Sequence, residues 1–148
     1  MSPGGRRPLV EGIVHNLRRA NFSLQGQFRN ALAQRNLSMG QFVVLRILAA
    51  DGRSTAKDLA ADMGVTTGNI TGLVDKLEAE GLVVRQRSKK DRRVVHLDAT
   101  EDGKTLLGDL RQATVTQVAQ AFSEWGTADL ERLDGLLQRI IADCPGPC

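Results

Sequence analysis

The stretch STAKDLAADMGVTTGNITGLVDKLEAEG, residues 54–81, decides the fold of this 148-residue chain. It contains two short segments of helical periodicity, separated by a turn at Gly64. Gly81 is placed to end the second helix in the left-handed conformation. Hydroxyl residues stand where each helix would begin, and the candidate caps are Ser54, Thr55, Thr66 and Thr67. Two short helices joined by a tight glycine turn predict a helix-turn-helix.

The hydrophobic period changes from 3.6 to 2 in the next segment, LVVRQRSKKDRRVVHLDA, residues 82–99. Val83 and Arg85 fall on one face of the first run, and Val95 and Leu97 share a face of the second. Five residues of turn chemistry, SKKDR, separate the runs. The pattern predicts a two-stranded hairpin whose tip carries the charge.

Positive charge is concentrated in this hairpin. Residues 85–93 contain six basic residues and one acid, Asp91, a local charge of +5 in a chain whose net charge is +3. Such asymmetry is typical of a surface that meets a polyanion. A solvated charged loop is the alternative that charge alone leaves open.

Long amphipathic helices flank this unit. Apolar residues recur at three- and four-residue steps over 9–36, and Ser38 with Gln41 forms a capping box that opens a second helix. Thr100 caps a helix over residues 101–125, which Gly126 stops, and Thr127 caps the last helix. The expected divisions are a disordered terminus, 1–8; an N-terminal dimerisation helix, 9–37; a DNA-binding lobe, 38–100; C-terminal dimerisation helices, 101–143; and a tail, 144–148.

The terminal helices favour a homodimer. A helix over residues 101–125 would span about 37 Å at 1.5 Å per residue, more than a small domain measures across. A central unit of some fifty residues cannot cover the apolar stripes of both terminal helices. A second copy related by a two-fold axis would cover them, although a bundle within one chain is the alternative.

Composition excludes several classes of protein. There is no apolar run of eighteen residues and no signal-peptide pattern, so a cytoplasmic protein that does not enter a membrane is expected. The two histidines, His15 and His96, lack an accompanying acid or cysteine pattern, so no catalytic residue, metal site or cofactor is expected. The cysteines, Cys144 and Cys148, form an incomplete zinc site in a CPGPC tail.

A helix-turn-helix followed by a basic hairpin is a winged helix, so the fold class is mainly α with a small β hairpin. We expect the recognition helix, residues 66–80, to enter the major groove and the wing, residues 85–96, to enter the minor groove of double-stranded DNA. The candidate DNA-binding residues are Ser54, Thr66, Thr67, Asn69, Thr71, Lys76, Arg85, Arg87, Lys89, Lys90, Asp91, Arg92 and Arg93.

Asp91 in this set, and the two helical glycines Gly68 and Gly72 outside it, each have two interpretations. Asp91 is an anion, so it serves either to orient a neighbouring arginine side chain or to stabilise its own turn, or both. Gly68 and Gly72 each cost roughly 1 kcal/mol relative to alanine in a helix. They either permit close approach of the helix backbone to DNA or are tolerated defects.

Residues 54–103 resemble the winged-helix core of the MarR (multiple antibiotic resistance regulator) family. The specific matches are TGLVDKLEAEGLVVR, the Asp91-x-Arg93 wing and the TEDG that follows from Thr100. The helical arms on either side match as well. The resemblance therefore extends over nearly the whole chain.

The resemblance implies a homodimeric transcriptional regulator, usually a repressor, that binds an inverted-repeat operator. It implies that Arg93 enters the minor groove and that Asp91 positions it. Many members release DNA on binding a small aromatic or phenolic effector. Two features depart from the pattern: Gly72 stands where many members have arginine, and the N-terminal helix lacks the cysteine of the hydroperoxide-sensing branch.

Two other functions remain open on the sequence. A winged helix can serve as a protein-interaction module whose wing contacts an acidic partner. The chain can also be a thiol-redox sensor that acts through Cys144 and Cys148. The operator, the regulated genes and the effector are not encoded in any recognisable pattern.

Overall fold

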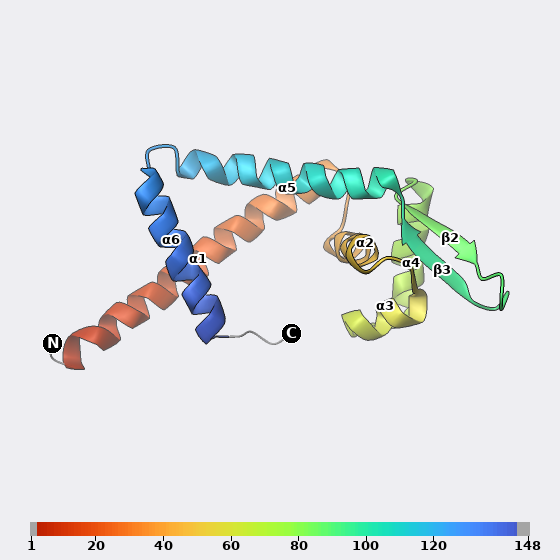
Figure 1. Cartoon of the computed structure of the whole chain (residues 1–148), viewed down its shortest axis with the longest axis horizontal. Helices are drawn as coiled ribbons and strands as arrows, with labels where there is room; N and C mark the ends of the chain where they lie inside the picture. Colours follow the sequence, from red (N-terminus) through yellow and green to blue (C-terminus); the bar gives the residue numbers. More distant parts are fainter. Residues whose placement is uncertain (1–2, 145–148) are drawn as a thin grey trace. The chain divides into compact units, whose positions relative to one another are not determined.

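Six helices and three short strands follow one another in the computed structural model, which describes residues 3–144 (Figure 1). In chain order they are α1 (Pro3–Gln34), α2 (Met39–Asp51), β1 (Ser54–Thr55), α3 (Ala56–Met63), α4 (Thr67–Ala79), β2 (Val83–Arg87), β3 (Val95–Ala99), α5 (Glu101–Ala121) and α6 (Thr127–Asp143). The described residues form two compact units, which divide between Val115 and Thr116. The first unit contains the helix-turn-helix and the wing, so the predicted fold class is confirmed.

α1 is longer at its start than the sequence predicted. Residues 3–8 were expected to be disordered because of their proline, glycine and arginine content, but the helix already begins at Pro3. Pro8 lies in the second turn, where its missing N–H removes a single intrahelical hydrogen bond and the rest of the helix is unaffected. Residues 1 and 2 lie outside the described part of the chain.

Side-chain caps fix where the helices of the first unit begin. Ser38 accepts a hydrogen bond from the Gln41 N–H, and the Gln41 side chain accepts one from the Ser38 N–H, which completes the predicted capping box of α2. Thr55 and Asp58 form a second capping box at α3. Gly64 ends α3 with a φ of 64°, in the left-handed region that glycine adopts without strain.

The sheet has one strand more than the predicted hairpin. β2 and β3 pair antiparallel with Arg85 opposite Leu97, and β1 pairs with the other edge of β3, giving the order β1-β3-β2. A strand of two residues is too short to show a period of 2, so no sequence pattern indicated β1. The loop of the hairpin is also longer than predicted, because β2 ends at Arg87 and β3 begins only at Val95.

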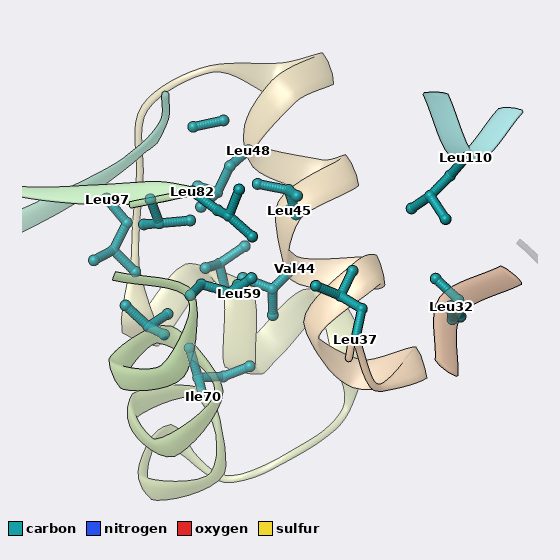
Figure 2. Close-up of a cluster of buried hydrophobic side chains, with 14 of the residues drawn as sticks. Leu32, Leu37, Val44, Leu45, Leu48, Leu59, Ile70, Leu82, Leu97 and Leu110 are labelled. Carbon is teal, nitrogen blue, oxygen red and sulfur yellow. The ribbon is translucent and has the colours of Figure 1, made fainter. Parts of the chain in front are cut away.

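The core of the first unit lies around α2. Figure 2 shows Leu82 and Leu97 on one side of this helix and Leu32 and Leu110 on the other. All four side chains are buried. α2 therefore packs against the winged helix on one side and against α1 and α5 on the other.

In the second unit, a tight turn joins the end of α5 to the start of α6. α5 ends at Ala121, earlier than the predicted residue 125, because the Phe122 N–H turns back to the carbonyl of Ala119 and the Trp125 N–H to that of Phe122. The rings of Phe122 and Trp125 pack edge to face, 5.2 Å between centroids. Gly126, not the predicted Thr127, is the N-cap of α6, and it supplies no side-chain hydrogen bond.

Candidate nucleic-acid interface

α4 presents a polar face opposite a buried one. Ile70, Val74 and Leu77 are fully buried and pack the helix against the core. Because these residues recur at helical spacing, the residues between them point outward. The exposed candidates on or beside this helix are Thr66, Thr67, Asn69, Thr71 and Lys76.

The hydroxyl groups at the start of α4 differ in the hydrogen bonds that they make. Thr66 is the N-cap, and its oxygen accepts a hydrogen bond from the Asn69 N–H at 3.3 Å. Thr71 donates its hydroxyl proton to the Thr67 carbonyl at 3.0 Å, so only its oxygen lone pairs are available to an incoming group. Within residues 3–144, the side chains of Thr67 and Asn69 make no hydrogen bond, which leaves both free to contact another molecule.

Gly68 and Gly72 of α4 differ from Gly103, the buried glycine of α5. A Cβ atom added at Gly72 would meet nothing within 4 Å, and one at Gly68 would meet only the Thr66 hydroxyl, at 4.0 Å. Internal packing of the chain therefore does not require glycine at either position. Gly68 and Gly72 leave the outer surface of α4 without side chains, four residues apart on the same face.

The wing loop is shaped by hydrogen bonds to two side chains. The Ser88 hydroxyl oxygen accepts from the N–H groups of Lys90 and Asp91, at 3.2 and 3.4 Å. The Asp91 carboxylate accepts from the N–H of Arg93 at 2.9 Å. Asp91 thus stabilises the turn itself, one of its two predicted roles, and it does so through the backbone of the residue that the sequence placed in the minor groove.

The loop presents its cations to solvent. Lys89, Lys90, Arg92 and Arg93 are all exposed. Arg87, Lys89 and Arg92 line a hollow of about 430 Å³ together with Ser88. Such a concave surface lined by three cations can accept an anionic group such as a phosphate.

Arg85 has a different environment from the other wing cations. Its side chain is only 29% exposed, and its two terminal nitrogens reach Asp75 Oδ1 at 2.6 Å and Glu78 Oε2 at 2.5 Å. Burial alone would lower the pKa of Arg85, but the hydrogen bonds to these two carboxylates raise it above its ordinary value. The charge of Arg85, a residue that the sequence lists among the candidate DNA contacts, is therefore already paired within the chain.

Two further residues bear on this surface. Ser54, a candidate contact, is half-buried in β1 opposite Leu97, and Thr55 rather than Ser54 caps α3. Arg53, which the sequence did not single out, donates a hydrogen bond to the Gln86 side chain at 2.8 Å and lies 3.9 Å from Asp98. Arg53 therefore contacts both strands of the wing, β2 through Gln86 and β3 through Asp98.

A separate cavity of about 400 Å³ lies in the first unit. Phe28 of α1 and Phe42 of α2 form one wall, with ring centroids 4.8 Å apart in an edge-to-face arrangement. The remaining lining residues are Arg46, Leu107, Arg111, Thr114 and Val115. The sequence named none of these residues, because they come from three helices that only the fold brings together.

Part of the chain matches a protein family, and several known proteins are similar to it. A family model described as "MarR family" matches residues 37–95, which include α2, the helix-turn-helix and most of the wing. The HTH-type transcriptional regulator FarR of Neisseria gonorrhoeae is 35% identical over 91 residues, a match that spans 62% of each chain. The solved structure of NadR in complex with 4-hydroxyphenylacetate is 30% identical, with a TM-score of 0.58, and covers 86% of this chain and 91% of that one.

The chain belongs to the MarR family. It is thus a DNA-binding transcriptional regulator, a non-enzymatic class of protein. Another solved MarR-type structure, an S. aureus MepR variant bound to an oligodeoxyribonucleotide, has a TM-score of 0.74 and covers 88% of this chain and 96% of that one. At 19% identity it shows the shared fold alone.

Three further observations on this MarR-family chain concern membrane spans, cysteines and metal sites. None of the helices within residues 3–144 has both the length and the apolarity to span a membrane. Cys144 is exposed just after α6, whereas Cys148 lies outside the described residues. Over the described range, no three metal-ligating side chains gather at one place.

Proposed function

We propose that this MarR-family chain is a homodimer that binds an inverted-repeat operator, with α4 in the major groove and the wing in the minor groove, and that it acts as a repressor. The observation that carries the proposal is the exposure of two surfaces on one lobe. They are the polar start of α4 and the cationic loop from Lys89 to Arg93. A winged helix needs both surfaces free to contact a single duplex.

The start of α4 suits the major groove. Thr67 and Asn69 have unpaired side chains within the described structure, and a carboxamide can donate to and accept from a base edge at once. The free N–H groups of the first helical turn favour a phosphate. Lys76 lies two turns further along the exposed face, where a lysine can pair with the DNA backbone.

The wing loop suits the minor groove. A narrow minor groove concentrates negative potential and attracts an inserted arginine. Arg93 is exposed and its backbone is held by Asp91, so we assign the inserting role to Arg93. Lys89 and Lys90 are then placed to neutralise flanking phosphates, as is the hollow formed by Arg87 and Arg92.

Unpartnered apolar residues on the terminal helices support the homodimer. On α1, Leu9 is 65% exposed and Phe22 is 72% exposed. α6 has no buried residue at all, and its Ile141 is 70% exposed. Soluble monomers rarely leave such stripes open. A second copy that covers them would give the two-fold symmetry that an inverted repeat requires.

The cavity between α1, α2 and α5 is the proposed effector site. Its walls are mostly apolar, with Arg46 and Arg111 at the lining. An aromatic ring against Phe28 and Phe42, with a carboxylate or phenolate toward an arginine, matches this chemistry. The 4-hydroxyphenylacetate in the NadR complex is such a molecule and is the first probe to use. We propose that this DNA-binding regulator acts in the cytoplasm.

The test is selection of bound duplexes from a random DNA library at near-physiological salt, with the full chain. We expect enrichment of an inverted repeat whose half-sites lie about one helical turn apart. Failure to enrich any sequence, with a dimer confirmed and effector absent, would contradict operator recognition and favour a protein partner for the wing.

The selected duplex then tests the wing. Arg93→Ala should weaken binding by about 1–3 kcal/mol if Arg93 enters the groove. Intact affinity in a folded, dimeric variant would show that another residue is inserted.

A further inference from the structure

Arg85 joins the wing to the recognition helix. It lies on β2, opposite Leu97 of β3, and its guanidinium reaches back to α4. One nitrogen donates to Asp75 at 2.6 Å and the other donates to Glu78 at 2.5 Å. A single side chain thus binds two successive turns of the helix that carries the major-groove residues.

The residue types fit this connection. Asp75 and Glu78 are three positions apart, so they lie on the same face of α4. A planar guanidinium can donate to two acceptors in fixed directions, whereas a lysine ammonium acts as a single point charge. Arg85 is also the least exposed of the three, at 29% for its side chain against 58% and 39% for the two acids. The partial burial limits screening of these pairs by solvent.

The two acids are otherwise out of place on a DNA-binding helix. Each would repel phosphates, and both lie after the buried residue Ile70 on a helix whose exposed side chains before them are polar and uncharged. A role within the lobe accounts for their presence, because each carboxylate accepts a charge-assisted hydrogen bond from Arg85.

We propose that Arg85 is a positioning residue that holds the wing at a fixed distance and angle from α4, so that Arg93 and the major-groove residues contact the duplex together. This inference rests on the proposed function. It assigns to Arg85 an action through α4 and the wing rather than a contact with DNA.

The direction in which operator affinity changes when the two acids are neutralised separates this role from simple electrostatics. Asp75→Asn with Glu78→Gln removes two negative charges from the DNA-binding lobe, so electrostatics alone predicts tighter binding. If Arg85 positions the wing, the same double variant loses both ion pairs and keeps only weaker hydrogen bonds to amide oxygens, so it binds the selected operator more weakly, by about tenfold. Equal or tighter binding by a folded double variant would overturn the proposal.

The control for the effect of charge alone is Glu80. Glu80 is exposed at the end of α4 and makes no ion pair within residues 3–144. Glu80→Gln removes one negative charge from the same helix, so its affinity should equal or exceed that of the unmodified protein. A loss in this control as large as in the double variant would show that the effect is not specific to the Arg85 connection.

A double-mutant cycle tests the positioning itself. In the unmodified protein, Arg93→Ala removes a contact made by a correctly placed wing. In the Asp75→Asn/Glu78→Gln background the wing is no longer held, so Arg93→Ala should cost several-fold less affinity than before. A purely structural role of Arg85 would leave the two effects independent and additive. Additivity would therefore overturn the proposal.

Arg85→Lys provides a second variant with unchanged charge. A lysine cannot make both bonds at once, so we expect its affinity to fall between those of the unmodified protein and the double variant. Should the double variant lose its helical circular dichroism, Asp75→Asn alone carries the test, because Asp75 is the more exposed acid. Absence of operator binding by the unmodified protein would instead contradict the proposed function.

Discussion

The Asp91 carboxylate accepts a hydrogen bond from the backbone N–H of Arg93, with 2.9 Å between Oδ1 and the nitrogen. The bond spans two residues and closes a turn of the wing loop. It orders the backbone of Arg93 and leaves the guanidinium of that residue exposed. An acid in a cationic loop thus acts as an acceptor for the backbone, which does not depend on its negative charge.

Asparagine should therefore replace Asp91 better than alanine does. Asp91→Asn keeps an oxygen at the same position and removes a negative charge, so operator affinity should be retained or increased. Asp91→Ala loses the acceptor and should weaken binding, although it removes the same charge. Both affinities are measured at one salt concentration. If asparagine is as damaging as alanine, the carboxylate charge itself is required.

Lys89 and Lys90 should contribute to affinity for DNA of any sequence. Alanine at either position removes a cation that neutralises a phosphate, so the slope of log affinity against log salt should become shallower by about 1. The measurement is a salt titration with operator and with unrelated duplex. Lys104→Ala is the control, because Lys104 already lies 2.8 Å from Glu101 on α5. A slope equal to that of the unmodified protein would remove that lysine from the phosphate contacts.

Gly103 should not tolerate a side chain. It is buried at the start of α5, and a Cβ atom there would overlap the Leu82 carbonyl oxygen and lie 2.9 Å from Leu45 Cδ1. The Leu82 carbonyl is backbone that already accepts from the Thr100 N–H, so it cannot move away freely. Gly103→Ala should lower the free energy of unfolding by about 1–3 kcal/mol, measured by denaturant titration.

The matched control for this change is Gly72→Ala. A Cβ atom at Gly72 meets nothing within 4 Å, so alanine should raise the free energy of unfolding by about 0.5–1 kcal/mol. Operator affinity of this stabilised variant then decides between the two interpretations of Gly72. A loss of affinity indicates close approach of the helix to DNA, and no loss indicates a tolerated defect.

Asp58 should stabilise the fold at neutral pH and lose that effect in acid. Its hydrogen bond to the Thr55 side chain, and then that to the Thr55 N–H, lower the pKa of Asp58 below its ordinary value. A group whose pKa is lower in the folded state stabilises the fold above its unfolded pKa, near 3.8, and this stabilisation is lost as pH falls through the folded pKa. Asp58→Asn should therefore lower the melting temperature at pH 7, and the difference should shrink below about pH 4. A difference that persists unchanged in acid would show that charge on Asp58 is not the cause.

The helix-turn-helix and the wing were predictable because their signals are local. The Ser38–Gln41 capping box and Gly81 at the end of α4 depend on residues a few positions apart. The buried face of α4 follows from helical spacing in the same way. Errors arose where a local signal was weak: at β1, which has only two residues, and at α6, where Gly126 rather than a hydroxyl residue is the cap.

The candidate site was predicted as a set of residues but not as a set of contacts. The sequence placed Arg85 among the candidate DNA-binding residues of the wing, and only the fold shows its hydrogen bonds to Asp75 and Glu78, ten and seven positions earlier. It left two roles open for Asp91, and the structure shows the one that acts through the Arg93 backbone.

By itself, the sequence determined that this chain would fold as a winged helix with a cationic wing, because caps, glycine turns and hydrophobic period act between near neighbours along the chain. Only the tertiary structure decided which charges are paired, where glycine is obligatory and where a cavity opens. Those properties depend on atoms that approach each other through folding, such as Gly103 against Leu82 or Phe28 against Phe42. No pattern along the chain records the distance between them.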